Sequence, residues 1–215
     1  MSAANPLPSR LLLVTDRHQA AVALEEIVGE AVAAGVRWVW LRDRDLPAGE
    51  RRALARRLLA VVHARGARLS VGGDVDLAAD IAADGVHLPA RAPIAPARAR
   101  LGPHALVGVS AHADADVAAA AAAGADYVTL SPIFASASKP GYGPALGVAA
   151  LTAAAPHGLP VLALGGVTVD LADACLCAGA AGIAAMGEVM RAARRPGGIP
   201  AIVRRYAAAL ATTVG

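Results

Sequence analysis

The feature that most restricts the fold of this 215-residue chain is a regular alternation of short apolar runs with longer amphipathic segments. Each run has the length of a strand and lacks polar alternation, as expected of parallel strands that are covered on both faces. The eight runs are residues 11–15, 38–42, 67–71, 85–88, 105–110, 127–131, 160–164 and 182–186. The segments between them have helical periodicity, at about 20–34, 48–65, 75–82, 93–101, 113–123, 148–154, 169–177 and 199–212.

A recurring turn supports the same arrangement. Similar Ala- and Gly-containing stretches at 33–36, 82–86, 122–127 and 178–183 lead into alternate predicted strands. In each, glycine permits the left-handed conformation that ends a helix. Eight β–α units predict an α/β fold, a single-domain (β/α)8 TIM barrel over residues 10–212, after a flexible N-terminus at 1–9. A doubly wound sheet is the alternative, but no Gly-x-Gly-x-x-Gly follows the first run.

Composition excludes several classes of protein. The hydrophobic content of 56% comes largely from alanine, and neither a membrane-spanning run nor a signal peptide is present, so we expect a cytoplasmic protein without a membrane partner. The arginines are dispersed and no basic run is interleaved with aromatic residues, so nucleic acid is not an expected partner. Cys175 and Cys177 lie two apart on a predicted helix, which favours a core and a surface residue over a disulfide or metal pair.

The stretch from 131 to 147 is predicted to be a functional loop. It holds three prolines and three glycines, which rule out a long helix or strand, and it contains the only lysine of the chain. Ser136, Ser138 and Lys139 offer hydroxyl and ammonium donors to an anionic ligand. An irregular loop of this length is usually functional or disordered, and its two aromatic residues argue against disorder.

A phosphate site is predicted where the seventh and eighth strands end, at Gly165, Gly166, Met186 and Gly187. Barrels often bind phosphate between these two loops, where bare backbone N–H groups face the anion. The alternative is that the glycines only form a tight turn. Glu188 is an objection to the site, because a carboxylate at this position would compete with phosphate unless it faces elsewhere.

Two arginines follow the second predicted strand. Alternation places Arg42 on the side opposite Leu41, toward the barrel mouth, where a guanidinium can bind a carboxylate or phosphate through two parallel hydrogen bonds. Arg44 lies on the same face, but it could instead pair with Asp43 or Asp45 and have no other role.

Two histidines are candidates for proton transfer. His112 follows Ser110 just beyond the fifth strand, at the catalytic end of a barrel, although an isolated histidine there can also be a surface residue. His87 lies inside a predicted strand between Val86 and Leu88, which favours a satisfied barrel-interior histidine.

Several of these motifs together resemble the superfamily of thiamine phosphate synthase and thiazole tautomerase. The resemblance covers about residues 11–190 and rests on the stretches 38–44, 84–89, 107–112, 124–127, 131–134, 165–166 and 182–184. It implies a TIM barrel, and it implies a phosphorylated thiazole as a small-molecule ligand. Whether the chain forms a homo-oligomer stays open.

The synthase pattern departs from this chain at its metal site. The resemblance implies Gln-x-Arg-x-Lys after the second strand, Asn-Asp after the third and Asp after the fourth, with Mg²⁺ held by carboxylates. Here Trp40 stands at the Gln position, Arg44 at the Lys position, the glycines 72–73 at Asn-Asp and Ala92 at the last Asp. Asp74 is one residue late and would reach a metal only if the loop shifted.

The tautomerase pattern fits these departures better, through Arg-Asp-Arg at 42–44, Gly73 and the Ser-x-His at 110–112. We therefore expect a metal-independent isomerase without a cofactor, which aromatises a thiazole carboxylate phosphate. In that hypothesis Arg42 and Lys139 bind the carboxylate and His112 transfers the proton. Two alternatives remain: a Mg²⁺-dependent thiamine phosphate synthase, a transferase whose pyrophosphate the 136–139 segment would bind, and a non-catalytic barrel in which Trp40 fills the pyrimidine site.

Overall fold

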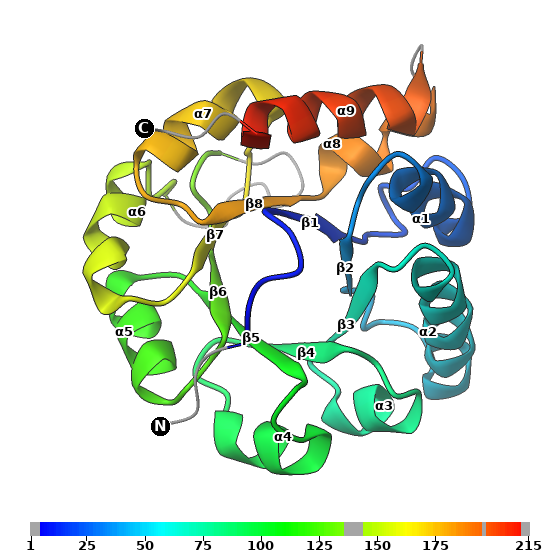
Figure 1. Cartoon of the computed structure of the whole chain (residues 1–215), viewed down its shortest axis with the longest axis horizontal. Coiled ribbons are helices and arrows are strands. Elements are labelled where there is room, and N and C mark those ends of the chain that lie inside the picture. The colour runs from blue at the N-terminus through cyan, green and yellow to red at the C-terminus, as the bar shows by residue number, and fades with distance from the viewer. Residues whose placement is uncertain (1–4, 136–143, 195–196, 212–215) are drawn as a thin grey trace.

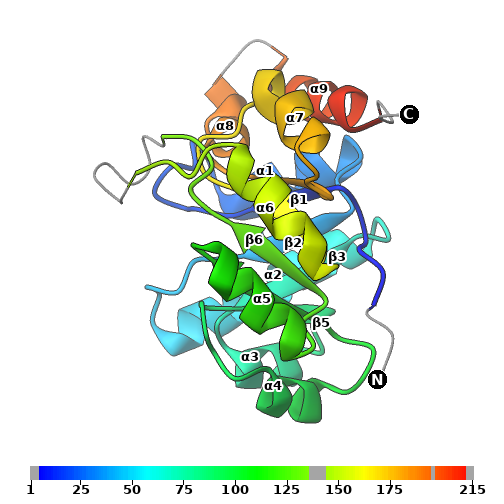
Figure 2. The same cartoon turned by 90° about the vertical axis from the view of Figure 1, so that its left-hand side faces the viewer.

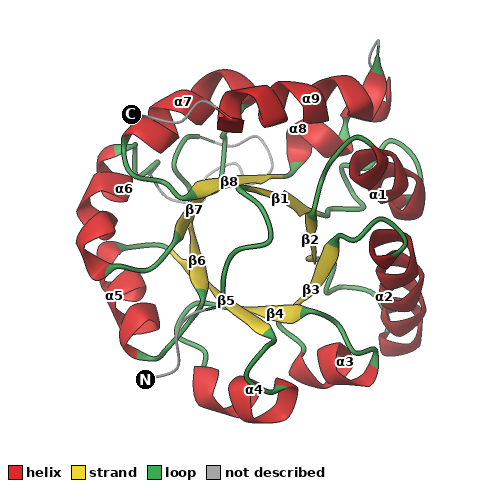
Figure 3. Ribbon diagram, viewed as in Figure 1, coloured by secondary structure: helices red, strands yellow, loops and turns green. Residues whose placement is uncertain are grey.

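The computed structural model describes residues 5–135, 144–194 and 197–211. Within them the strands follow the order of the chain around a closed parallel barrel, and β8 pairs with β1 through Leu11 and Ile183 (Figures 1 and 3). The strands are β1 (Leu11–Val14), β2 (Trp38–Leu41), β3 (Arg68–Gly72), β4 (Gly85–Leu88), β5 (Leu106–Ala111), β6 (Tyr127–Leu130), β7 (Val161–Ala163) and β8 (Gly182–Ala185). The predicted single-domain (β/α)8 barrel is confirmed.

Helices form an outer ring around the strands, and the side view shows α5, α6 and α7 along one flank of the barrel (Figure 2). They are α1 (Leu24–Ala33), α2 (Ala48–His63), α3 (Val75–Asp80), α4 (Ile94–Leu101), α5 (Asp114–Ala122), α6 (Ala149–Ala154), α7 (Val169–Cys177), α8 (Gly187–Met190) and α9 (Gly198–Ala211), with 3-10 turns η1 (Ala155–His157) and η2 (Ala192–Arg194). The short α8 and η2 were not predicted. α9 packs against α1 and α7 and closes the ring.

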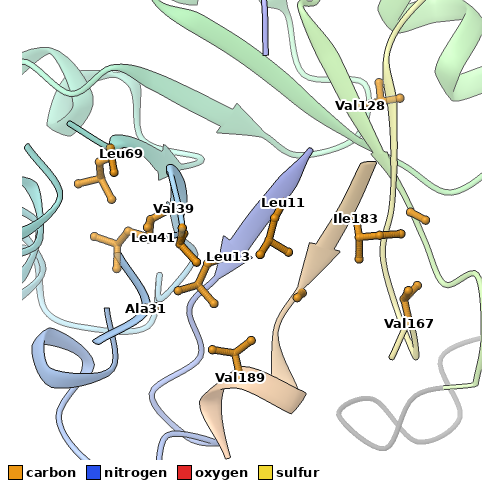
Figure 4. Close-up of a cluster of buried hydrophobic side chains, with 14 of the residues drawn as sticks. Leu11, Leu13, Ala31, Val39, Leu41, Leu69, Val128, Val167, Ile183 and Val189 are labelled. Atoms are coloured by element: carbon orange, nitrogen blue, oxygen red, sulfur yellow. The ribbon is translucent and has the colours of Figure 1, made fainter. Parts of the chain in front are cut away.

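Alternation along the strands divides the core into two layers. On β2, Val39 and Leu41 point outward into the helix layer, which is drawn in Figure 4, whereas Trp38 and Trp40 point into the barrel. The ring of Trp38 packs edge-on against Tyr127, with centroids 4.6 Å apart. Gly108 makes room for the Tyr127 ring, because a Cβ at this position would overlap it. The interior is therefore filled by side chains and is not a pore.

The segment before β1 crosses the N-terminal end of the barrel (Figure 1). Leu7 packs against the apolar interior, and the backbone N–H of Asn5 donates to Oδ1 of Asp126 at 2.9 Å. Residues 5–9 of the predicted flexible N-terminus thus contact the barrel and cover apolar side chains that its open end would otherwise expose. Residues 1–4 lie outside the described residues.

Two smaller expectations can also be compared with the structure. Cys175 is buried and Cys177 is exposed, both as free thiols, which confirms a core residue and a surface residue. Among the described residues, no helix has the length and apolar character needed to cross a membrane.

Candidate active site

Two adjoining cavities lie at the C-terminal ends of the strands, and both are lined by Gln19 and Arg191. The larger has a volume of about 650 Å³ and lies at the β1 and β2 exits. The smaller has a volume of about 230 Å³ and lies between the β7 and β8 exits. This is the end of the barrel where TIM-barrel enzymes bind their substrates.

The smaller cavity brings together the four residues predicted to bind phosphate: Gly165, Gly166, Met186 and Gly187. The first two glycines have φ values of 88° and 66°, which disfavour any side chain. A Cβ at Gly165 would lie 2.8 Å from Cα of Pro132, and one at Gly166 would lie 2.7 Å from the carbonyl oxygen of Phe134. The left-handed turn and its close packing against the loop after β6 thus both require glycine at these two positions.

Glu188 also lines the smaller cavity, so the objection raised by its charge stands, although its carboxylate has hydrogen-bond partners. Its Oε2 accepts from the backbone N–H of Val169 at 3.2 Å and from the hydroxyl of Tyr206 at 2.8 Å. Burial, and secondarily the Glu188 charge, raises the pKa of Tyr206, so the phenol stays protonated and donates. The carboxylate is thereby held against the start of α7 and the inner face of α9.

Arg191 is a functional candidate that the sequence analysis missed. It donates to Oε1 of Gln19, and its Nη1 would lie 2.6 Å from a Cβ placed on Gly187. It forms no ion pair with a carboxylate in the part of the chain that the structure describes. The four-residue spacing from Gly187 could have indicated it, because such a spacing places two residues on one face of a helical turn.

In the larger cavity, Arg42 lies toward the barrel mouth, with Nη1 3.7 Å from Oδ2 of Asp16. Arg44 lines the same cavity and is exposed. Its two sequence neighbours bind other groups: Asp43 accepts from Thr15 at 2.6 Å, and Asp45 accepts from Arg17 at 2.6 Å. The hydrogen bonds from Arg17 and His18 hold the pKa of Asp45 well below its usual range. The pairing considered for Arg44 with either aspartate is therefore not observed.

The β3 and β4 exits do not provide the ligands that Mg²⁺ prefers. Gly72, Gly73 and Ala92 bring no side-chain oxygen. Both oxygens of Asp74 are engaged, because Oδ1 accepts from the backbone N–H of Leu77 at 2.9 Å and Oδ2 from Nη1 of Arg51 at 2.9 Å. Over the described ranges, no group of three or more His, Cys, Asp or Glu side chains could hold a metal ion. The residues present therefore do not fit the metal site that the resemblance implies.

His87 is a satisfied interior histidine, as predicted. Its Nδ1 lies 3.0 Å from the hydroxyl of Tyr127 and its Nε2 lies 3.1 Å from the hydroxyl of Ser110, while the indole of Trp40 stacks on it with centroids 3.8 Å apart. Burial, and then the charge of Arg44, lowers the pKa of His87 to about 3. The ring is therefore neutral near physiological pH.

The other predicted site residues lie apart from the two cavities or outside the described residues. Nδ1 of His112 is 2.8 Å from the carbonyl oxygen of Ser131 at the β5 and β6 exits, and its backbone N–H donates to Asp116. Among the described residues, neither Ser110 nor His112 lines either cavity. Ser136, Ser138 and Lys139 lie outside the described residues.

The fold and these cavities define a (β/α)8 barrel whose mouth is lined by glycine backbone and guanidinium groups. Residues 11–189 match the family model described as thiamine monophosphate synthase, and the chain belongs to this family.

Named relatives agree with this assignment. A protein of Geobacter sulfurreducens, described as "Putative thiamine-phosphate synthase", is 43% identical over 183 residues, which cover 84% of this chain and 86% of the relative. The thiamine-phosphate synthase of Roseiflexus castenholzii is 37% identical over 87% of this chain and 86% of its own. The solved thiamine phosphate pyrophosphorylase from Pyrococcus furiosus superposes with a TM-score of 0.82 at 26% identity, covering 95% of this chain and 96% of that one.

These relatives overturn the hypothesis of a thiazole tautomerase, and with it the isomerase class. Relatives that match over 86% of their own length are named as synthases, which are transferases. The hypothesis rested on missing metal carboxylates at Gly73 and Ala92. Missing carboxylates indicate that a metal ion is not held at these two positions. They do not by themselves identify a different reaction.

Proposed function

We propose that this protein is a thiamine phosphate synthase, which joins a pyrimidine pyrophosphate to a thiazole phosphate. The observation that carries the proposal is the similarity to relatives named thiamine-phosphate synthase, at 43% and 37% identity over more than four fifths of both chains. The geometry supports it, because the reaction needs two anion sites next to each other and the barrel mouth has two adjoining cavities.

In this proposal the smaller cavity binds the phosphate of the thiazole. The backbone at Gly165, Gly166 and Gly187 supplies N–H donors, Met186 contributes apolar wall, and Arg191 brings a positive charge. Glycine allows the phosphate oxygens to approach the backbone closely. The substrate is thereby held with its ring toward the larger cavity, across the boundary formed by Arg191 and Gln19.

The larger cavity binds the pyrophosphate, through Arg42 and Arg44. Guanidinium groups match phosphate oxygens in a bidentate geometry and keep their charge at all working pH values. On sequence grounds we add Ser136, Ser138 and Lys139 as further donors to the same anion.

The bond changes need charge stabilisation more than proton transfer. The C–O bond between the pyrimidine methylene and the pyrophosphate breaks, and the electron pair leaves with the oxygen. The lone pair of the thiazole nitrogen then forms the new C–N bond, which gives thiamine phosphate and free pyrophosphate. Cations fixed near the leaving oxygen stabilise the developing negative charge. No proton is transferred in these steps, so His112 has no obligatory acid–base role.

The test is direct synthesis from the two substrates, with thiamine phosphate measured by mass spectrometry. The wild type should form product, and Arg42→Gln should reduce kcat/KM for the pyrimidine pyrophosphate by about tenfold or more, as expected for the loss of a charged hydrogen bond. Arg56→Gln is the matched control, because Arg56 is exposed on α2 and away from both cavities. Thiazole phosphate binding without product would instead favour the non-catalytic barrel.

A further inference from the structure

The space above Gly72 and Gly73 is filled by two side chains from β2 and its exit. A Cβ at Gly72 would lie 2.8 Å from Nε1 of Trp40, and a Cβ at Gly73 would lie 3.1 Å from Nη1 of Arg44. Four of the five positions at which this chain departs from the synthase pattern thus form two contacting pairs, Trp40 with Gly72 and Arg44 with Gly73. The larger indole and guanidinium occupy the volume that side chains at 72 and 73 would need.

The packing of Trp40 shows that this arrangement has a cost. Its Nε1 is buried and has no hydrogen-bond partner among the described residues. A buried unpaired donor destabilises a fold by about 1–3 kcal/mol. The indole nevertheless stacks on His87, with an angle of 36° between the rings, and this contact fixes its orientation over Gly72.

Arg44 carries a positive charge that no described carboxylate neutralises by an ion pair. Its two acidic sequence neighbours and the aspartate that follows Gly73 are engaged elsewhere: Asp43 with Thr15, Asp45 with Arg17, and Asp74 with Arg51. The charge of Arg44 also contributes to the lowered pKa of His87 and of Arg51, after burial in both cases.

We propose that Arg44 supplies, without a bound divalent cation, the positive charge that meets the pyrophosphate at the β2 and β3 exits. This inference rests on the proposed synthase function, from which the pyrophosphate comes. A metal site requires carboxylates, which would pair with Arg44 and cancel its charge. Glycine at 73 leaves the guanidinium unpaired and open to the anion. The loss of the carboxylates and the presence of arginine therefore both favour direct binding of the pyrophosphate by Arg44.

The first test is calorimetric binding of inorganic pyrophosphate in EDTA. The wild type should bind, and adding Mg²⁺ should not tighten the binding. Arg44→Gln should weaken it by about tenfold or more, the usual effect of losing a charged hydrogen bond. Arg56→Gln, which removes an exposed arginine from α2, should remain within about twofold of wild type. Binding that requires Mg²⁺, or equal affinity of Arg44→Gln and wild type, would overturn the inference.

A second pair of variants tests the role of glycine at 73. Gly73 has φ of +68°, a conformation that Asn and Asp tolerate better than most residues. Gly73→Asp places a carboxylate beside Arg44, whereas Gly73→Asn adds nearly the same volume without the charge. In EDTA the Asp variant should bind pyrophosphate several-fold more weakly than the Asn variant. Equal affinities would contradict the claim that an unpaired Arg44 is what binds the anion.

Product formation separates this inference from the proposed function. Thiamine phosphate formed in EDTA by the wild type supports both. Product that appears only with Mg²⁺ leaves the synthase proposal standing and removes the inference. Pyrophosphate binding in EDTA without product under either condition removes the synthase proposal and retains Arg44 as a metal-independent anion site.

Discussion

His87 shows how one buried residue makes the stability of the barrel depend on pH. Its pKa is about 3 in the folded protein and near 6.5 in an unfolded chain. Between these values the unfolded state binds more protons, so stability falls as the pH decreases, by up to about 1.4 kcal/mol per pH unit.

His87→Gln removes this titration and keeps an amide that can bond to Tyr127 and Ser110. We expect the free energy of unfolding of the variant, measured in urea between pH 4.5 and pH 7, to depend less on pH than that of wild type. His104→Gln, an exposed histidine, should keep the wild-type slope. Equal slopes for all three proteins would mean that folding does not lower the pKa of His87.

Among the described residues, Arg191 is the one charged side chain that lines both cavities. Because its guanidinium lies over Gly187, Arg191→Gln should raise KM for the thiazole phosphate by about tenfold, with a smaller change in KM for the pyrimidine pyrophosphate. Arg194→Gln removes a nearby exposed arginine and serves as the control. A larger effect on the pyrimidine substrate would assign Arg191 to the other cavity.

At the scale of elements, the β6 and β7 exits are joined by close backbone contacts. The N–H of Ile133 donates to the carbonyl oxygen of Leu164 at 2.9 Å, and the N–H of Phe134 donates to that of Gly165 at 2.9 Å. Gly166 lies against this pairing. The wall of the phosphate cavity therefore depends on two loops that hold each other in place.

Gly166→Ala tests this dependence, and Gly158→Ala is a matched control. Both glycines have a left-handed backbone, at φ of 66° and 68°, which costs an alanine about 1–2 kcal/mol. Only the Cβ at Gly166 meets other atoms, the carbonyl oxygens of Phe134 and Ala135. In urea unfolding, Gly166→Ala should lose at least about 1 kcal/mol more than Gly158→Ala, and it alone should lose phosphate affinity. If Gly166→Ala kept its phosphate affinity, phosphate binding would not depend on the pairing of these two loops.

The strands and the long helices could be predicted because each shows its periodicity within one segment. α8 could not, since four residues are too few to show a period. The contact of Trp40 with Gly72 could not be predicted either, because it joins residues of neighbouring strands whose register the sequence does not give. The same limitation explains the wrong functional hypothesis. The sequence reveals that a carboxylate is missing at Gly73, but only the structure reveals that the guanidinium of Arg44 lies beside this position.

For the whole molecule, the two ends of the barrel have different tasks. The C-terminal end carries the two cavities, and the N-terminal end is covered by residues 5–9. Asp126 organises that covered end, because it accepts from the backbone N–H of Asn5 at 2.9 Å, from Arg98 at 2.8 Å and from the backbone N–H of Val107 at 2.7 Å. Substitutions at the N-terminal end of such a barrel act on stability, and those at the opposite end act on chemistry.

Leu7→Ala tests this separation. Leu7 packs on the barrel interior at the end opposite the cavities, and its truncation should lower the free energy of unfolding by about 1–2 kcal/mol, less than for a fully buried leucine because the residue is only half-buried. The values of kcat and KM measured well below the melting temperature should remain within about twofold of wild type. Val22→Ala, at an exposed apolar residue, should change neither stability nor kinetics measurably. A KM that rises in Leu7→Ala while the protein is still folded would show that the interior layer transmits packing changes to the anion sites, and stability and chemistry would then share the same core.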